Sequence, residues 1–442
     1  MNKSKNRLAL YGGTPVITKK FERFNRIGTE EMIAVQEVMK KGVLSRFLGE
    51  WDPDFYGGEK VQQFESEWAS YFKSKYAISV NSNTSGLISA IGAIGVEPGD
   101  QVIVSPWTMC ASATSILVWN AIPVFVDIEL DTYNLDPEKI EKAINEKTKA
   151  IVVTDIFGHP AKLDKIMNVA RRYNLKVIED AAQAPGAFYS CNIKCNDICK
   201  SPCKNKYVGT VADIGVFSLN YHKHIHTGEG GMCVTNNDKY AERLRLIRNH
   251  GESSVADAKI NDISNIIGFN FRMGEIEAAI GIEQLKKLSQ IVKERQNAAE
   301  QINKNLRNLE GLRTFDTLPN CSHSYYVLPF EYFHDVTGVS KDLIVKALRA
   351  EGVSIGDSYK NLHLLPMYQK KIAYGKKGFP WINPGQKNDV SYDKGICPVA
   401  ESLNERYLDL GMCAYDYNTE QVQLISDAFE KVWKNLKYLL KN

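Results

Sequence analysis

The chain has 442 residues, of which 44% are hydrophobic, so it is long enough to bury more than one core. Its formal net charge of +3 gives no reason to expect a nucleic-acid partner. No apolar run is long enough to span a bilayer, and the N-terminal apolar run is too short for a signal peptide. We therefore expect a soluble, cytoplasmic protein with no membrane partner.

Two helices are predicted near the start, at 29–41 and 60–72, from apolar residues at helical spacing. Beyond residue 76, short apolar strands alternate with helices. The predicted strands are 77–80, 101–104, 123–126, 150–154 and 176–178, and the predicted helices are 84–94, 110–118, one that begins at 136–137, and 163–172. Such alternation predicts an α/β fold with a mostly parallel sheet, whose ligands gather at the carboxyl ends of the strands.

A polar run follows the first of these strands. Asn81-Ser-Asn-Thr-Ser-Gly86 comes directly after the strand and opens a helix. Exposed backbone N–H groups, hydroxyls and the positive end of the helix dipole make such a segment suitable for a phosphate. It is neither a Walker A loop nor a GxGxxG fingerprint, which disfavours nucleotide cofactors. The alternative is a well-capped helix without a ligand.

An aspartate stands at the end of another predicted strand. In Val177-Ile-Glu-Asp-Ala-Ala-Gln183 the strand runs directly into two acids, which places Asp180 at its carboxyl end. A carboxylate there can bind a metal, a ribose hydroxyl or a protonated ring nitrogen. No histidine or acid at ligand spacing completes a metal site around it. A helix N-cap is the structural alternative.

Lys223 lies in a turn rich in histidine and glycine, between predicted strands at 214–217 and 232–235. A lysine held in such a turn can lose part of its hydration and become a nucleophilic amine. The alternative is a surface lysine in a hairpin. Considered together, a phosphate site, a strand-end aspartate and a turn lysine on one sheet are what pyridoxal 5'-phosphate requires. We therefore predict that cofactor.

Several groups of residues along the chain form a recognisable combination. They are Asn83-Thr84, Val177-Ile-Glu-Asp-Ala-Ala-Gln183, Phe217-Ser218 with Lys223, Thr227-Gly-Glu-Gly-Gly231, and Gly268-Phe-Asn-Phe-Arg-Met273 followed by Glu275 and Ala278-Ala279. This combination closely resembles the DegT/DnrJ/StrS family, from about Leu8 to the C-terminal helices. The resemblance implies a fold type I transferase that uses pyridoxal phosphate to aminate keto-sugars, usually nucleotide-linked, or keto-cyclitols.

The resemblance also implies roles for residues around the cofactor ring. Lys223 corresponds to the Schiff-base lysine, Asp180 to the partner of the pyridine nitrogen, and Gln183 to a contact near the ring hydroxyl. Family members commonly stack an aromatic residue on the ring where this chain has Met109, whose sulfur could pack there instead. Trp107, two residues earlier, is not at the matching position.

Another set of residues corresponds to the family's phosphate ligands. Asn83, Thr84 and Ser218 match ligands from the same subunit. Asn270 resembles the residue that reaches the phosphate from the neighbouring subunit. That role implies a homodimer whose active sites are shared between two copies.

The histidines near the lysine depart from the family pattern. His226 stands where the family usually has threonine, and with His222 and His224 it crowds Lys223. We expect these histidines to be local structure or substrate contacts, because the lysine can itself move the proton. His363, in Asn-Leu-His-Leu-Leu-Pro, resembles a region that approaches substrate. A solvated loop histidine is the alternative there.

The remaining chain predicts a second, smaller α/β domain. A long helix at 275–306 leads out of the large domain, which we place at 1–290, and the small domain follows at 291–442. Within the second domain we predict a strand at 325–328, a helix at 341–350 and a helical end at 418–440.

A cysteine-rich insertion is predicted at 190–205, where the family usually has a short hairpin. Its four cysteines, Cys191, Cys195, Cys199 and Cys203, recur at every fourth position. Four thiols this close could hold zinc or an iron–sulfur cluster. The spacing is neither CxxC…CxxC nor a usual ferredoxin run. The alternative is a loop of free or partly oxidised thiols.

The sequence therefore predicts an aminotransferase whose partners are an amino acid donor, glutamate or glutamine, and a keto-sugar or keto-cyclitol acceptor. One alternative is a sugar dehydratase of the same fold, which uses pyridoxamine phosphate and sometimes an iron–sulfur centre. Those relatives replace the lysine with histidine, whereas Lys223 is present here. The other alternative is a non-catalytic regulator that binds the cofactor.

Overall fold

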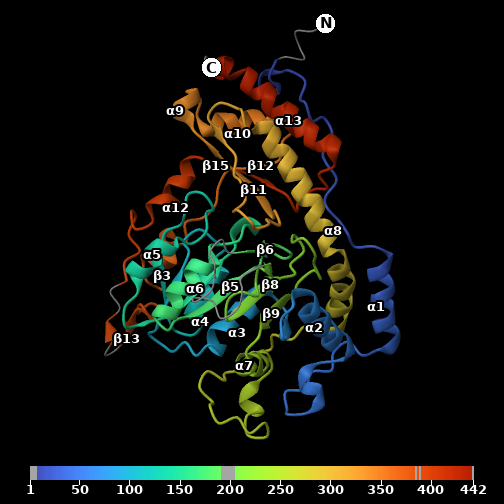
Figure 1. The fold of residues 1–442 in the computed structure, drawn as a ribbon, viewed down its shortest axis with the longest axis vertical. Helices are drawn as coiled ribbons and strands as arrows, with labels where there is room; N and C mark the ends of the chain where they lie inside the picture. Colours follow the sequence, from blue (N-terminus) through green and yellow to red (C-terminus); the bar gives the residue numbers. More distant parts are fainter. Residues whose placement is uncertain (1–6, 191–204, 384–385, 388–389, 441–442) are drawn as a thin grey trace.

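The computed structural model of the chain describes residues 7–190, 205–383, 386–387 and 390–440. Its centre is a seven-stranded sheet with helices packed around it (Figure 1). In order across the sheet, the strands are β1 (Tyr76–Val80), β9 (Gly231–Thr235), β8 (Ile214–Ser218), β5 (Lys176–Asp180), β4 (Thr148–Thr154), β2 (Gln101–Val104) and β3 (Ile122–Phe125). β9 runs antiparallel to its neighbours β1 and β8, and the other pairs are parallel. The predicted mostly parallel sheet is confirmed, and every strand except β9 ends at the same edge.

The helices around this sheet follow the predicted pattern closely. They are α1 (Thr29–Lys41), α2 (Glu59–Phe72), α3 (Asn83–Ala93), α4 (Ala111–Val118), α5 (Pro137–Ala143), α6 (Leu163–Arg172), α7 (Asp238–Arg248) and α8 (Glu275–Leu306). α1 agrees with its prediction at both ends because its signals are local. The Glu31 side chain accepts from the Gly28 N–H at 2.8 Å, and Gly42 ends the helix at a φ of 73°.

Each face of the sheet has its own core, because successive side chains of a strand point to opposite faces. On β5, Ile178 packs in the core formed with α3, α4 and α7. Val177 packs in the core formed with α2, α5, α6 and α8. Asp180 therefore shares the face of Ile178, and Glu179 shares the face of Val177.

A second sheet, antiparallel throughout, lies above the first in Figure 1. Its strands, in order, are β10 (Leu312–Arg313), β11 (Val327–Tyr332), β15 (Tyr407–Gly411) and β12 (Ile355–Gly356). The remaining helices are α9 (His334–Thr337), α10 (Lys341–Ala350), α11 (Pro366–Gln369), α12 (Pro398–Ser402), α13 (Thr419–Lys434) and α14 (Leu436–Leu439). The 32-residue helix α8 runs from the large sheet to the small one (Figure 1).

Each of the two cores includes segments from the other part of the chain, and the division at residue 290 stays a prediction. Leu8 and Ile17, from the N-terminal segment, are buried in the core of the small sheet. Leu362 and Tyr368, from the C-terminal part, are buried in the core of the large sheet. The predicted boundary lies inside α8, which is helical on both sides of residue 290. The order of elements along the chain does not reveal this exchange of segments, because it depends on tertiary contacts between residues that are distant in sequence.

The predicted cysteine insertion is described only at its base, a short ribbon of β6 (Phe188–Tyr189) and β7 (Lys206–Tyr207). Its four cysteines, Cys191, Cys195, Cys199 and Cys203, lie outside the described residues. A second ribbon pairs β13 (Ile382–Asn383) with β14 (Gln386–Lys387). In the described parts of the chain, no three histidine, cysteine or acidic side chains are arranged to hold a metal ion. Nor does any described helix combine the length and apolarity that a membrane span requires.

Candidate active site

The predicted site residues converge at the carboxyl edge of the large sheet. Asp180 is the last residue of β5, and Ser218 is the last residue of β8. Asn83 is the first residue of α3, which follows β1 after a short loop. Although 97 residues separate them in sequence, the Asn83 amide nitrogen Nδ2 donates to Asp180 Oδ1 at 3.3 Å. The parallel sheet thus assembles the cluster that the strand-end argument predicts.

Asp180 is buried and held from three directions. The Ser112 hydroxyl of α4 donates to Asp180 Oδ2 at 2.7 Å, and the Ala182 N–H donates to Oδ1 at 3.3 Å. Burial raises the pKa of Asp180, because the charged form loses hydration, while these donors and Lys223 act in the opposite direction. The result is an oriented carboxylate in a dry setting, suited to a cationic partner.

Lys223 is presented on a closed turn between β8 and β9. Its N–H donates to Asn220 O at 2.9 Å, and the Thr227 N–H donates back to Leu219 O at 3.0 Å. The side chain is 7% exposed, and burial lowers the pKa of Lys223 to about 8, although Asp180 and Cys413 act to raise it. A lysine amine with such a pKa is partly neutral near physiological pH and can act as a nucleophile or a base.

The ε-amino group of Lys223 has an aromatic neighbour that sequence reasoning missed. Nζ lies 4.3 Å from the centre of the Tyr326 ring. Among the described residues, no hydrogen bond or ion pair reaches Nζ. Tyr326 directly precedes β11, more than a hundred positions along the chain, so only the folded structure brings the two together.

The histidines around the lysine are uncharged or structural. Burial lowers the pKa of His224 to about 3, and its Nε2 pairs with the Ser324 carbonyl at 2.8 Å, which assigns the proton to Nε2. His226 Nδ1 accepts from the Gly228 N–H at 3.3 Å, and burial lowers its pKa as well. Burial, with a contribution from the Lys223 ammonium, lowers the pKa of His222. These rings therefore add no positive charge beside the lysine at neutral pH.

The N-terminal end of α3 has the form of an anion site. Ser82 caps the helix, its hydroxyl accepting from the Ser85 N–H at 3.0 Å. Thr84, in the first turn, is exposed. Gly231 of β9 lies so near that an added Cβ would be 2.6 Å from the Ser82 carbonyl carbon. Ser218 pairs with Gly231 across the β8–β9 ladder, so the predicted phosphate residues lie around one helix end.

Gln183 and Tyr359 line the next part of the site. Gln183 Oε1 accepts from the Phe157 N–H at 2.6 Å, and burial raises the pKa of Tyr359 while Gln183 acts to lower it. Tyr359 also packs against Trp107, with ring centres 5.4 Å apart. Trp107 is fully buried, whereas Met109 is 55% exposed. Met109, which stands at the family's stacking position, is therefore the more exposed of the two.

Two predicted residues lie apart from this cluster. Asn270 is exposed, and its Oδ1 accepts from Arg272 Nε at 2.8 Å. His363 is completely buried, and its Nε2 pairs with Glu401 Oε1 at 2.9 Å. The solvated loop histidine that the sequence left open is thus excluded, and His363 presents no exposed surface to a substrate in this chain.

Residues 26–430 match the DegT/DnrJ/EryC1/StrS aminotransferase family. The chain belongs to this family. It is 34% identical over 311 residues to the GDP-perosamine synthase of Caulobacter vibrioides, a match that covers 70% of this chain and 79% of that one. It is 30% identical over 444 residues to the L-glutamine:2-deoxy-scyllo-inosose aminotransferase of Streptoalloteichus tenebrarius, covering 97% and 98% of the two chains. The crystal structure of an aminotransferase from Psychrobacter cryohalolentis shares 27% identity with a TM-score of 0.77, and covers 94% of this chain and 100% of that chain.

These relationships make the chain an enzyme of a sugar aminotransferase family with the fold type I architecture. The resemblance seen in the sequence and the predicted fold class are both confirmed. Sequence reasoning missed Ser112, Tyr326 and Tyr359. Only Ser112 had a detectable signal, since it lies in the helix after a strand end, where site residues gather.

Proposed function

We propose that this aminotransferase uses pyridoxal 5'-phosphate to transfer an amino group from glutamate or glutamine to a keto-sugar, nucleotide-linked, or to a keto-cyclitol. The observation that carries the proposal is that a buried amine, Lys223, and a buried, oriented carboxylate, Asp180, act on each other's charge at the carboxyl edge of one sheet. The two groups interact electrostatically, and each has its pKa moved by burial.

The residues fit this cofactor in three respects. The buried Asn83 Oδ1 has no hydrogen-bond partner within the described structure, so the cluster has an unused acceptor. The capped end of α3, with exposed Thr84, offers backbone N–H groups to a phosphate. Asp180 is a buried carboxylate that lacks a salt bridge among the described residues, and a protonated pyridine nitrogen would supply the cation.

When bound, pyridoxal phosphate supplies an electron sink and carries the amino group between two substrates. In the proposed mechanism, Lys223 would hold the cofactor covalently, and its Nζ, once free, would accept and return a proton. Asp180 would keep the ring nitrogen protonated, with Ser112 and Asn83 fixing the carboxylate. Gln183 would contact the ring near its hydroxyl, and Met109 would pack on the ring.

The remaining residues of the proposal bind and orient. Asn83, Thr84 and Ser218 would bind the phosphate. His226 is half-buried at the end of the lysine turn, where it would contact substrate. The substrate role that the sequence suggested for His363 stays a prediction, because the ring is buried against Glu401.

The acceptor class follows from two relatives whose names point to different chemistries. One is named for a GDP-linked amino sugar, and the other for the amination of an inosose by glutamine. The second match extends over nearly all of both chains, whereas the first covers 70% of this one. We therefore include nucleotide-linked keto-sugars and keto-cyclitols in one acceptor screen, with glutamate and glutamine as donors.

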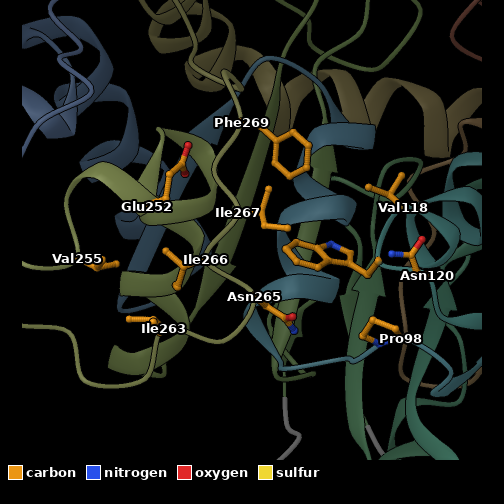
Figure 2. Close-up of a pocket in the computed structure, with 11 residues that line it drawn as sticks. Pro98, Val118, Asn120, Glu252, Val255, Ile263, Asn265, Ile266, Ile267 and Phe269 are labelled. Atoms are coloured by element: carbon orange, nitrogen blue, oxygen red, sulfur yellow. The ribbon is translucent and has the colours of Figure 1, made fainter.

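We also propose a homodimer, in which Asn270 of one copy reaches the phosphate of the other. The segment before Asn270 exposes Ile263 at 64% and Ile267 at 67%, an apolar surface that a partner would cover. Figure 2 shows these side chains beside a pocket of about 510 Å³, together with Phe269. Sedimentation of the purified protein tests for the dimer. Asn270→Ala should weaken cofactor binding without dissociating the dimer.

The central test replaces the lysine. Lys223→Ala should abolish the visible absorption band of lysine-bound cofactor and all amino transfer, because no other described amine lies in the cluster. Lys394→Ala, at an exposed lysine far along the chain, is the matched control and should keep both. An unchanged spectrum in Lys223→Ala would exclude the proposal. The acceptor screen then uses the enzyme in its pyridoxamine phosphate form and measures return of the band.

A further inference from the structure

The aromatic ring beneath Lys223 has no role in the mechanism so far. The Tyr326 ring centre is 4.3 Å from Nζ, well within the range over which an ammonium is attracted to the negative face of an aromatic ring. Tyr326 is partly buried and is held on both sides of its backbone. Its N–H donates to Phe157 O at 2.9 Å, and its carbonyl accepts from the Met412 N–H at 3.0 Å.

Within the described residues, no hydrogen bond or ion pair competes with this ring for the ammonium. Asp180 acts on Lys223 only through space, since its hydrogen bonds in the described structure are with Ser112, Asn83 and Ala182 and none is with the lysine. The thiol of Cys413 is buried and its pKa is raised to about 11, so it is uncharged at neutral pH.

The histidines around the amine are neutral as well. His224 and His222 both have lowered pKa values, and both rings face Tyr326, with ring centres 6.5 and 6.0 Å away. The charged Arg295 acts on Cys413 and His224 and is not among the groups that shift the pKa of Lys223. Burial raises the pKa of the Tyr326 hydroxyl, so the ring acts as a neutral aromatic surface and not as a phenolate.

We propose that Tyr326 is a positioning residue for Lys223: its ring face holds the ε-amino group, in the ammonium form, whenever that amine is not bonded to the cofactor. This inference rests on the proposed function, because it matters only for a lysine that alternates between a covalent and a free state. The ring would give the released amine a fixed place within the site. It also favours the protonated state, so the amine is a stronger proton acceptor than burial alone would allow.

The role differs from simple packing in one measurable way. Attraction to the ring face depends on the electron density of the ring, whereas packing depends on its shape. Replacing ring hydrogens with fluorine removes electron density and hardly changes the shape. A fluorine series at position 326 therefore separates the two.

The experiment measures the pKa of Lys223 in the full-length, cofactor-free protein by NMR. The protein carries lysine labelled with carbon-13 at Cε, and the Lys223 signal is the one missing in Lys223→Arg. Tyr326→Phe is the reference and should titrate like the wild type. Mono-, di- and trifluorophenylalanine at position 326 should lower the pKa of Lys223 stepwise, by about one unit in total. Equal thermal unfolding midpoints across the series confirm that the variants fold alike.

A pKa of Lys223 that stays constant or rises across the series would overturn the inference. In the loaded enzyme, the acidic limb of the kcat profile for the donor half-reaction should move to lower pH in parallel. Because the titration needs no cofactor, it can fail while Lys223→Ala still abolishes amino transfer. Failure of the inference and failure of the proposed function are thus distinguishable.

Discussion

The two faces of β5 carry carboxylates that are adjacent in sequence and opposite in environment. Asp180 faces α3 and α4, where side chains hold it and Lys223 lies across from it. Glu179 faces the other core, where three backbone N–H groups, from Gly209, Val211 and Ala212, donate to it at 2.6 to 3.2 Å. Both are buried, and burial raises the pKa of each.

The two carboxylates differ in whether they can still interact with a further group. Glu179 is used up in fixing the 209–212 turn, and its charge adds to the effect of burial in raising the pKa of Asp155, because two buried carboxyls cannot both be charged at low cost. Asp180 has a lysine across the site and an unused Asn83 oxygen beside it. Burial alone therefore does not mark a functional acid; incomplete pairing does.

The largest effect should come from the face of Asp180. Asp180→Asn keeps the shape of the side chain and removes its charge, so kcat/KM for amino transfer should fall by about 10³-fold. The free energy of unfolding of the cofactor-free protein should change little, because burying an amide costs less than burying a charge. Steady-state kinetics and urea unfolding measure the two. A variant with near-normal kcat/KM would contradict the functional role that distinguishes Asp180 from Glu179.

Glu179→Gln should have the reverse signature. The new amide points a donor at backbone N–H groups, so the free energy of unfolding should fall by about 2–4 kcal/mol while kcat per folded molecule is retained. The raised pKa of Glu179, about 7 against 4.5, makes the folded chain hold a proton that the unfolded chain has released. Wild-type stability should therefore fall between pH 4.5 and 7, and urea unfolding should show no such slope in the variant.

A smaller effect is expected at the lysine. The shift in the pKa of Lys223 from 10.5 to about 8 corresponds to about 3 kcal/mol against folding at neutral pH. Lys223→Met should therefore stabilise the cofactor-free protein by about 1–3 kcal/mol in thermal or urea unfolding. The folded chain binds fewer protons than the unfolded chain between pH 8 and 10.5, so wild-type stability should rise across that window. Lys394→Met, at an exposed site, should change nothing; a destabilised Lys223→Met would contradict the assignment.

The smallest effect on activity is expected at His363. Its pairing with Glu401 resembles the fixed state of Glu179, since Glu401 also accepts from the Gly395 and Cys397 N–H groups. His363→Gln should lower the free energy of unfolding by about 1 kcal/mol and leave the KM for the acceptor unchanged. A large rise in KM, without loss of stability, would instead support the substrate role.

Local signals predicted most of the fold and the outline of the site. Capping residues and helical spacing are written within a few positions, so α1 and α6 could be predicted to the residue. The strand-end rule found Asp180 because parallel strands share an edge, whereas Ser218 came from the family resemblance. Family motifs added roles that geometry alone does not give.

What could not be predicted depends on contacts between distant parts of the chain. Tyr326 meets Lys223 only because the small sheet lies over the lysine turn, and nothing in its local sequence marks it. His363 stands in a polar loop whose burial is decided by Glu401, 38 positions away. The exchange of segments between the two cores hid the domain division for the same reason.

The continuous helix α8 makes the two sheets mechanically dependent. Its 32 residues span about 48 Å, a length over which a tilt of about 5° displaces the far end by about 4 Å. Near its start, Gln284 accepts from the His226 N–H at 3.4 Å; near its end, Asn305 donates to Ser426 of α13 at 2.9 Å. If the small sheet rotates and moves α8 with it, the turn that holds Lys223 is therefore displaced by a small distance.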